Sequence, residues 1–250
     1  MRIATVEGLL VGSPVEGTSF LVRITTDSGL TGIGQSAAWG YPEACAAVVE
    51  TFRRYLVGAD PLRIEHHWQV LYRALPFRGS ILSGALSAVD IALWDIKGKH
   101  FQTPIWELLG GRCRDRIRLC LLTGGADPDE LGRNVRAAAQ EGFTAVKFDP
   151  LLPGYQDMTL ARLIAHAREM VAAAREAAGL DVDIVVELHR KLTPLTAIPL
   201  AEALREFSTL FYEDPIQIDS IQSQAQMGRR VNLPLAQGER LNTIWEFREL

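Results

Sequence analysis

The 250-residue sequence has few cysteines, no long apolar run and little excess charge of either sign. Its three cysteines, Cys45, Cys113 and Cys120, form no C-x-x-C motif and cannot all pair, so we expect a reducing, cytoplasmic location. No apolar run approaches the roughly 18 residues of a membrane-spanning helix, and the N-terminal residues lack the features of a signal peptide. A membrane is therefore not an expected partner.

The balance of charge also argues against nucleic acid as a partner. The chain carries 26 basic and 30 acidic side chains, a formal net charge of −4, and no basic stripe. With 48% hydrophobic residues the composition is that of a globular protein with a substantial core. No strand is followed by a glycine-rich dinucleotide fingerprint or a P-loop, which disfavours a nucleotide-binding fold.

The first 112 residues predict an α+β domain, because strands come first and helices are grouped after them. A tight turn at 27–29 separates two predicted strands, and the small, polar residues 11–18 are typical of a mobile loop. Apolar residues then recur at helical spacing. The predicted strands are 20–26 and 30–34, and the predicted helices are 42–56, 63–75 and 83–99.

Residues 113–250 alternate strand and helix, which predicts an α/β domain with a parallel sheet. The Asp127-Pro128 and Thr193-Pro194 pairs are typical helix starts. The predicted strands are 117–122, 143–148, 183–187, 209–212 and 233–236. A (β/α)8 barrel needs eight such units, so we expect about five strands of an incomplete barrel, with the C-terminal strands missing.

Three glutamates end successive predicted strands at equal intervals of 26 residues, namely Glu187, Glu213 and Glu239. The carboxyl ends of parallel strands converge on one face, where ligands bind. Carboxylates gathered there would repel one another unless a cation compensates, and oxygen ligands suit Mg²⁺. The alternative is that each glutamate caps a helix or pairs with a basic side chain.

The motifs around these glutamates resemble those of a known family. Glu187-Leu-His189, Tyr212-Glu-Asp-Pro215 and Gly238-Glu-Arg240 are similar to the metal-ligand motifs of the mandelate racemase/muconate lactonizing branch of the enolase superfamily. Residues 83–99 and 104–111 resemble the capping-domain signature of that branch. The resemblance implies an α+β capping domain, a TIM-like barrel, and Mg²⁺-assisted removal of a proton α to a carboxylate through an enediolate.

The remaining motifs limit the reactions that the resemblance allows. Racemases of this branch commonly carry Lys-x-Lys on the second barrel strand, whereas this sequence has Lys147-Phe-Asp149, which disfavours a lysine-dependent racemase. His189 stands two residues after Glu187, on the same face of an extended segment because side chains alternate along a strand, and is predicted to be a general acid. The alternative is a histidine that caps a helix or supports a metal ligand. The motif resembles that of galactonate- and mannonate-type sugar-acid dehydratases, although their first metal ligand is usually Asp.

Other roles stay open at this stage. Lys147 can reach either a substrate carboxylate or a metal-ligand carboxylate, and Asp149 either a sugar hydroxyl or His189. Trp39 is a candidate for substrate binding or for core packing. The resemblance implies a proton-abstracting histidine on a seventh barrel strand, and the 250 residues contain no counterpart of it.

The predicted function is therefore Mg²⁺-dependent dehydration of a sugar acid (an aldonate) by a cytoplasmic homo-oligomeric hydro-lyase. The enzymatic alternatives are an acid-sugar epimerase or racemase and a cycloisomerase of the same superfamily. The alternative from another class is a non-catalytic, truncated paralogue that binds metal.

Overall fold

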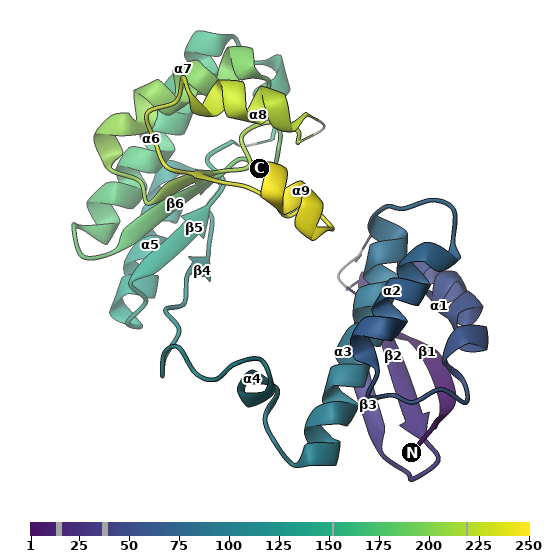
Figure 1. Cartoon of the computed structure of the whole chain (residues 1–250). Coiled ribbons are helices and arrows are strands. Elements are labelled where there is room, and N and C mark those ends of the chain that lie inside the picture. Colours follow the sequence, from purple (N-terminus) through teal and green to yellow (C-terminus); the bar gives the residue numbers. More distant parts are fainter. Residues whose placement is uncertain (14–16, 37–39, 152, 219) are drawn as a thin grey trace. The chain divides into compact units, whose positions relative to one another are not determined.

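The computed structural model describes residues 1–13, 17–36, 40–151, 153–218 and 220–250 (Figure 1). The chain folds as two compact units, Met1–Asp115 and Arg116–Leu250. Within the described ranges, no helix is both long and apolar enough to cross a membrane. The predicted substrate contact Trp39 lies outside the described residues.

The first unit contains a three-stranded antiparallel sheet in the order β1-β2-β3. Its strands are β1 (Ile3–Ser13), β2 (Gly17–Thr26) and β3 (Thr31–Gln35). The prediction of a loop over residues 11–18 is wrong at both ends, because Val11 pairs with Ser19 and Gly12 with Thr18. These residues belong to the antiparallel pairing of β1 with β2, where backbone hydrogen bonds hold the chain in place although the side chains are not buried.

The described residues of the first unit then form the helices α1 (Pro42–Leu56), α2 (Ile64–Ala74), α3 (Ser80–Phe101) and α4 (Ile105–Leu108). The first three match the predicted helices to within a few residues. Helix α3 packs very closely on β3, because a Cβ atom at Gly32 or Gly34 would lie 2.0 Å from a backbone oxygen of α3. Glycine on β3 is therefore what allows the long helix to approach the sheet.

The second unit contains a parallel sheet in the sequential order β4-β5-β6-β7-β8, as predicted. Its strands are β4 (Leu121–Leu122), β5 (Ala145–Phe148), β6 (Asp183–Glu187), β7 (Phe211–Glu213) and β8 (Leu235–Ala236). The first strand is much shorter than the predicted 117–122. The described residues of the second unit thus form five parallel strands, against eight in a closed (β/α)8 barrel.

Helices connect these strands at the positions that the capping residues indicate. They are α5 (Pro128–Gln140), α6 (Leu160–Ala178), α7 (Pro194–Leu204), α8 (Ile221–Gly228) and α9 (Ile244–Glu249), with short 3₁₀ turns at Tyr155–Asp157 and Arg205–Phe207. Asp127 caps α5 by accepting a hydrogen bond of 2.8 Å from the Glu130 amide. Thr193 forms a capping box at the start of α7.

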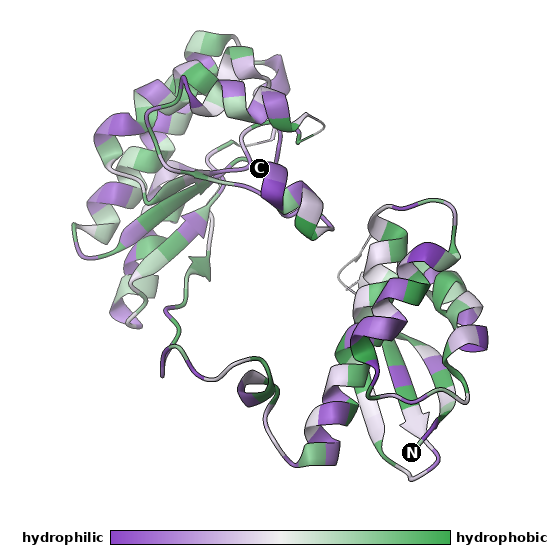
Figure 2. Cartoon of the chain, viewed as in Figure 1, coloured by the Kyte–Doolittle hydropathy of each residue, from purple (hydrophilic) through white to green (hydrophobic). Residues whose placement is uncertain are grey.

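Strand alternation separates the apolar and polar faces of the parallel sheet. Val146, Phe148, Ile184, Val186 and Tyr212 belong to the core that the sheet shares with the helices. The intervening residues face the other way. Figure 2 shows the resulting hydrophobic strands and the mixed hydropathy of the helices. The residues on the second face that lie nearest the carboxyl ends of the strands are charged, and they form the candidate site.

Asp90 on α3 gives the first unit a pH-dependent stability. Burial, and then the charge of Glu65 on α2, raise the pKa of Asp90 from 3.8 to about 6. The folded state therefore holds this proton more tightly than the unfolded state, so the free energy of unfolding falls as pH rises between about 4 and 6. We expect Asp90→Asn to remove this decline and to stabilise the unit at pH 7 by about 1 kcal/mol, after allowance for solvent screening.

Urea unfolding across this pH range measures the effect of Asp90→Asn. Glu65→Gln should stabilise the unit at neutral pH by a smaller amount, because it removes only the second cause of the shift. An unchanged pH slope in Asp90→Asn would contradict the assignment.

Candidate active site

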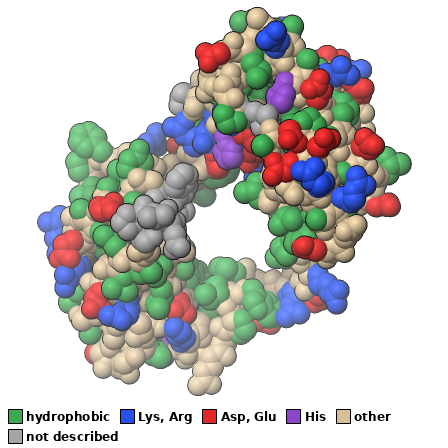
Figure 3. Space-filling view, turned by 180° about the vertical axis from the view of Figure 1, so that it is seen from behind, with side chains coloured by type: hydrophobic (Ala, Val, Ile, Leu, Met, Phe, Trp, Pro, Cys, Tyr) green, Lys and Arg blue, Asp and Glu red, His purple; other side chains and the backbone are tan. Residues whose placement is uncertain are grey.

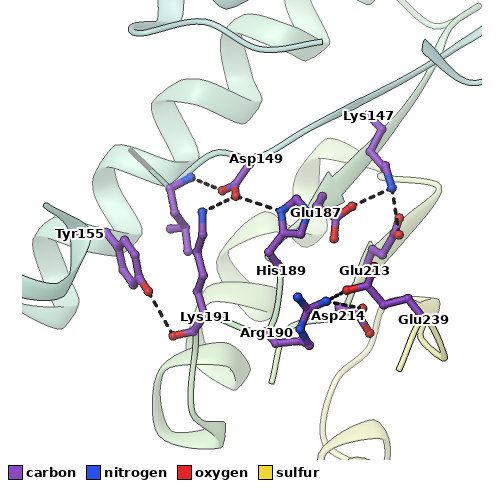
Figure 4. A network of polar contacts seen from close by, with 11 residues as sticks. Lys147, Asp149, Tyr155, Glu187, His189, Arg190, Lys191, Glu213, Asp214 and Glu239 are labelled. Carbon is purple, nitrogen blue, oxygen red and sulfur yellow. Dashed lines mark hydrogen bonds and ion pairs between the residues drawn. The ribbon is translucent and has the colours of Figure 1, made fainter. Parts of the chain in front are cut away.

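Two acidic side chains and one basic side chain meet at the carboxyl ends of three adjacent strands. Glu187 and Glu213 stand opposite each other in the register of β6 and β7. The Lys147 ammonium, from β5, lies 2.6 Å from Glu187 Oε2 and 2.9 Å from Glu213 Oε1 (Figure 4). Of the two roles left open for Lys147, the structure thus shows a contact with the predicted ligand carboxylates.

Glu187 is only partly satisfied by this contact. The residue is 3% exposed, and its Oε1 atom is buried with no hydrogen-bond partner among the described residues. A buried carboxylate oxygen normally has a donor or a cation beside it, because its desolvation is otherwise uncompensated. The free oxygen therefore leaves Glu187 able to bind one more positive group.

The close approach of Lys147, Glu187 and Glu213 shifts pKa values in the site. Burial alone would lower the pKa of Lys147, but hydrogen bonds and charge interactions with Glu187 and Glu213 outweigh it and raise the pKa above its ordinary value. Burial raises the pKa of the neighbouring Asp214, which Arg190 opposes and the two glutamates reinforce. The lysine is thus held in its charged form between the two glutamates.

Glu239 lies apart from the other two predicted ligands. Strand β8 ends at Ala236, and the Leu241 amide donates a hydrogen bond of 2.9 Å to Gly238 O, so Glu239 lies in a turn and not at a strand end. Its side chain is 49% exposed and pairs with Arg190, which also lies 3.5 Å from Asp214. Within the described part of the chain, no three His, Cys, Asp or Glu side chains are grouped closely enough to hold a metal ion.

His189 reaches the site through a turn. The prediction that it continues the alternation of β6 is wrong, because the strand ends at Glu187 and both His189 and Arg190 have left-handed φ values of 48° and 63°. Such backbone is strained for these residue types. Hydrogen bonds hold it in place, from the Leu188 amide to Glu213 O (3.0 Å) and from the Arg190 amide to Asp214 O (2.6 Å).

The turn directs two side chains toward Asp149, which follows β5. His189 Nδ1 lies 3.6 Å from Asp149 Oδ2, and the Lys191 ammonium pairs with the same oxygen (Figure 4). Of the two roles left open for Asp149, the structure thus shows a contact with His189. Sequence reasoning missed Lys191, Arg190 and Asp214, and only their position beside the ligand motifs could have indicated them.

The ion pairs of the site involve five carboxylates and three cationic side chains, so the site carries a formal excess of two negative charges when His189 is neutral. On the face seen in Figure 3, acidic side chains gather beside basic side chains and histidine. This excess fits a divalent cation, and carboxylate oxygens are ligands that Mg²⁺ accepts. Glu187 and Glu213 offer the nearest pair of ligands.

Comparison with known proteins places both units in one family. Residues 9–110 match the family "Mandelate racemase / muconate lactonizing enzyme, N-terminal domain", and residues 130–250 match "Enolase C-terminal domain-like". D-galactonate dehydratase from Variovorax paradoxus is 34% identical over 233 residues, and that from Ralstonia nicotianae is 36% identical. These matches cover 92% of this chain but only 60% of each dehydratase.

Solved structures agree with the sequence matches. A mandelate racemase/muconate lactonizing enzyme from Jannaschia sp. CCS1 is 32% identical, with a TM-score of 0.90 over 100% of this chain and 70% of the other. A mandelate racemase/muconate lactonizing enzyme-like protein from Roseovarius sp. TM1035 is 31% identical, with a TM-score of 0.91 over 100% of this chain and 68% of the other.

Lys147 should be essential to stability when metal is absent. Lys147→Met leaves Glu187 and Glu213 facing each other without a counter-charge, which should lower the free energy of unfolding by about 3 kcal/mol. Urea unfolding in the presence of a chelator measures this loss. Arg168→Met, which removes the exposed Arg168–Glu206 pair of the same unit, is the matched control and should cost less than about 1 kcal/mol. Equal losses in the two variants would refute the prediction.

Proposed function

Because the chain belongs to the mandelate racemase/muconate lactonizing enzyme branch of the enolase superfamily, we propose that its protein is a Mg²⁺-dependent hydro-lyase that removes water from a sugar acid. The observation that carries the proposal is the set of charged side chains at the ends of β5, β6 and β7. The similarity to D-galactonate dehydratases supports an aldonate as the class of substrate. The chain spans about 60% of the length of these relatives, so the proposal concerns the whole protein.

The proposed magnesium ligands are Glu187, Glu213 and Glu239. The unpartnered Glu187 Oε1 and the excess negative charge of the network support a cation here. Glu239 would have to leave Arg190 to join the other two. When bound, Mg²⁺ would supply positive charge that stabilises a substrate carboxylate as the neighbouring C–H bond loses its proton.

His189 is the proposed general acid. Its side chain is 49% exposed, so a substrate can approach it, and Asp149 lies beside it. As an imidazolium it would give a proton to the β-hydroxyl as the C–O bond breaks, and water would leave. Lys147, which pairs with both Glu187 and Glu213, would offset the repulsion between them and face the substrate carboxylate. No residue of this chain is assigned as the base that takes the α-proton.

Product analysis tests the proposed reaction. The protein, expressed from its complete reading frame, is incubated with Mg²⁺ and a set of aldonates, and products are identified by NMR. A 2-keto-3-deoxy acid is the expected product. An epimer of the substrate would instead identify an epimerase, and the absence of turnover in a folded, Mg²⁺-binding protein would identify a non-catalytic paralogue.

Glu187 should dominate metal binding. In the unaltered protein, Mg²⁺ at about 100 times its Kd should stabilise the fold by about 2.7 kcal/mol. We expect Glu187→Gln to remove most of this gain, since it removes the buried charge of a proposed ligand. Glu202→Gln on α7, which breaks an exposed pair with Arg205, is the control and should leave the gain intact. Magnesium titration of thermal stability measures both, and full stabilisation of Glu187→Gln would exclude this ligand.

His189→Asn should separate the two chemical steps. Dehydration should fall by about 10²–10⁴, the usual worth of a positioned proton donor, while Mg²⁺ affinity stays nearly unchanged. Exchange of the substrate α-proton with deuterated solvent should persist, because abstraction precedes departure of the hydroxyl. His100→Asn, in the first unit, is the control.

Turnover of His189→Asn near that of the unaltered protein would eliminate the acid role. Loss of exchange together with turnover, in a folded and metal-loaded variant, would make His189 a base and favour an epimerase.

A further inference from the structure

Asp149 is held at both of its carboxylate oxygens. Oδ1 accepts a hydrogen bond of 2.8 Å from the Leu151 amide, which closes a tight turn directly after β5. Oδ2 pairs with the Lys191 ammonium and lies 3.6 Å from His189 Nδ1. The Asp149 side chain is 23% exposed, so it has little freedom to swing toward solvent. Its carboxylate is therefore a fixed acceptor that faces one particular nitrogen of His189.

Lys191 is equally confined. Its side chain is 28% exposed, and its ammonium lies 5.6 Å from the centroid of the Tyr155 ring, within range of a cation–π interaction. The Tyr155 hydroxyl donates a hydrogen bond of 3.5 Å to the Lys191 carbonyl oxygen. A lysine paired with a carboxylate and placed over a ring serves poorly as a mobile contact for substrate. It is well placed to fix Asp149.

The backbone turn brings these groups together. The left-handed residues His189 and Arg190 reverse the chain after Glu187, so that the side chains of His189 and Lys191 reach the same oxygen of Asp149. The 3.6 Å between His189 Nδ1 and Asp149 Oδ2 is longer than a hydrogen bond, but a fixed negative charge facing Nδ1 favours the tautomer that carries its proton on that nitrogen. With Nδ1 turned to Asp149, Nε2 is the nitrogen left to act on a substrate.

We propose that Lys191 and Asp149 form a positioning pair for His189, in which Lys191 fixes the Asp149 carboxylate and Asp149 fixes the orientation and tautomer of the imidazole. The inference rests on the proposed function only in taking His189 as the acid. It makes Lys191 a positioning residue that acts through Asp149, with no contact to substrate. It also explains why a carboxylate, and not a second lysine, follows Lys147 by two residues.

The direct test is the tautomer of His189. Two-bond ¹H–¹⁵N spectra of protein with ¹⁵N-labelled histidine, recorded with Mg²⁺ at a pH where imidazole is neutral, distinguish the two tautomers. The chain has five histidines, and His189→Asn assigns the signal of His189. We expect the Nδ1–H form in the unaltered protein. In Lys191→Met and Asp149→Asn it should shift to the Nε2–H form that free histidine prefers, and Lys191→Arg should keep Nδ1–H.

Kinetics supply a second readout, since a general structural defect would not separate the steps. Lys191→Met should lower kcat for dehydration by about 10- to 100-fold, as the loss of residues that orient a functional group typically does. KM and α-proton exchange should stay close to those of the unaltered protein, and Lys191→Arg should restore most of kcat. Arg168→Met, which removes the exposed Arg168–Glu206 pair of the same unit, should change neither readout.

Two results would overturn the positioning pair. One is a His189 tautomer that is the same in Lys191→Met as in the unaltered protein. The other is a raised KM at unchanged kcat, which would make Lys191 a substrate contact. Because the spectra need no turnover, they decide the positioning role even if no sugar acid is dehydrated, and a failure of that kind would count against the proposed function alone.

Discussion

The second unit depends on how it compensates two carboxylates that its sheet forces together. The parallel register of β6 and β7 sets Glu187 directly opposite Glu213, an arrangement that is destabilising for like charges. Lys147 from β5 lies on the same face, because the register pairs it with Val185, two residues before Glu187. One ammonium thus pairs with carboxylates from two strands at once. The register that pairs β5, β6 and β7 therefore also determines which charged side chains meet in the site.

The same alternation explains why a charged site can stand on a stable sheet. Along each strand, one set of residues enters the core shared with the helices, and the other set is free to carry charge. Tyr212 shows how closely the two sets are coupled. Its ring is fully buried and its hydroxyl donates to Ala197 O at 3.1 Å, which ties β7 to α7 immediately before Glu213. Packing of the apolar face against the helices therefore fixes the position of each charged side chain on the opposite face of the sheet.

The sequence allowed most of the architecture to be predicted, because its signals are local. Helix starts at Asp127 and Thr193 are marked by capping chemistry, and the order of the parallel strands follows from strand–helix alternation. The loop predicted over residues 11–18 was wrong because composition does not reveal backbone pairing. The convergence of Glu187 and Glu213 was foreseen, since each ends a strand. Glu239 differs because Gly238 turns the chain after β8 has ended.

The contacts of the site were harder to foresee, because they depend on backbone that leaves no mark in the sequence. His189, Arg190 and Asp214 all take left-handed φ values without being glycine, and this conformation determines which carboxylate each neighbouring side chain meets. Each predicted metal ligand already has an internal cation, which is Lys147 for Glu187 and Glu213 and Arg190 for Glu239. A divalent ion must compete with these cations for the same oxygens. Its affinity therefore depends on the difference between its own attraction to these oxygens and that of the internal cations. The ion gains most at the buried Glu187 Oε1, which has no hydrogen-bond partner among the described residues.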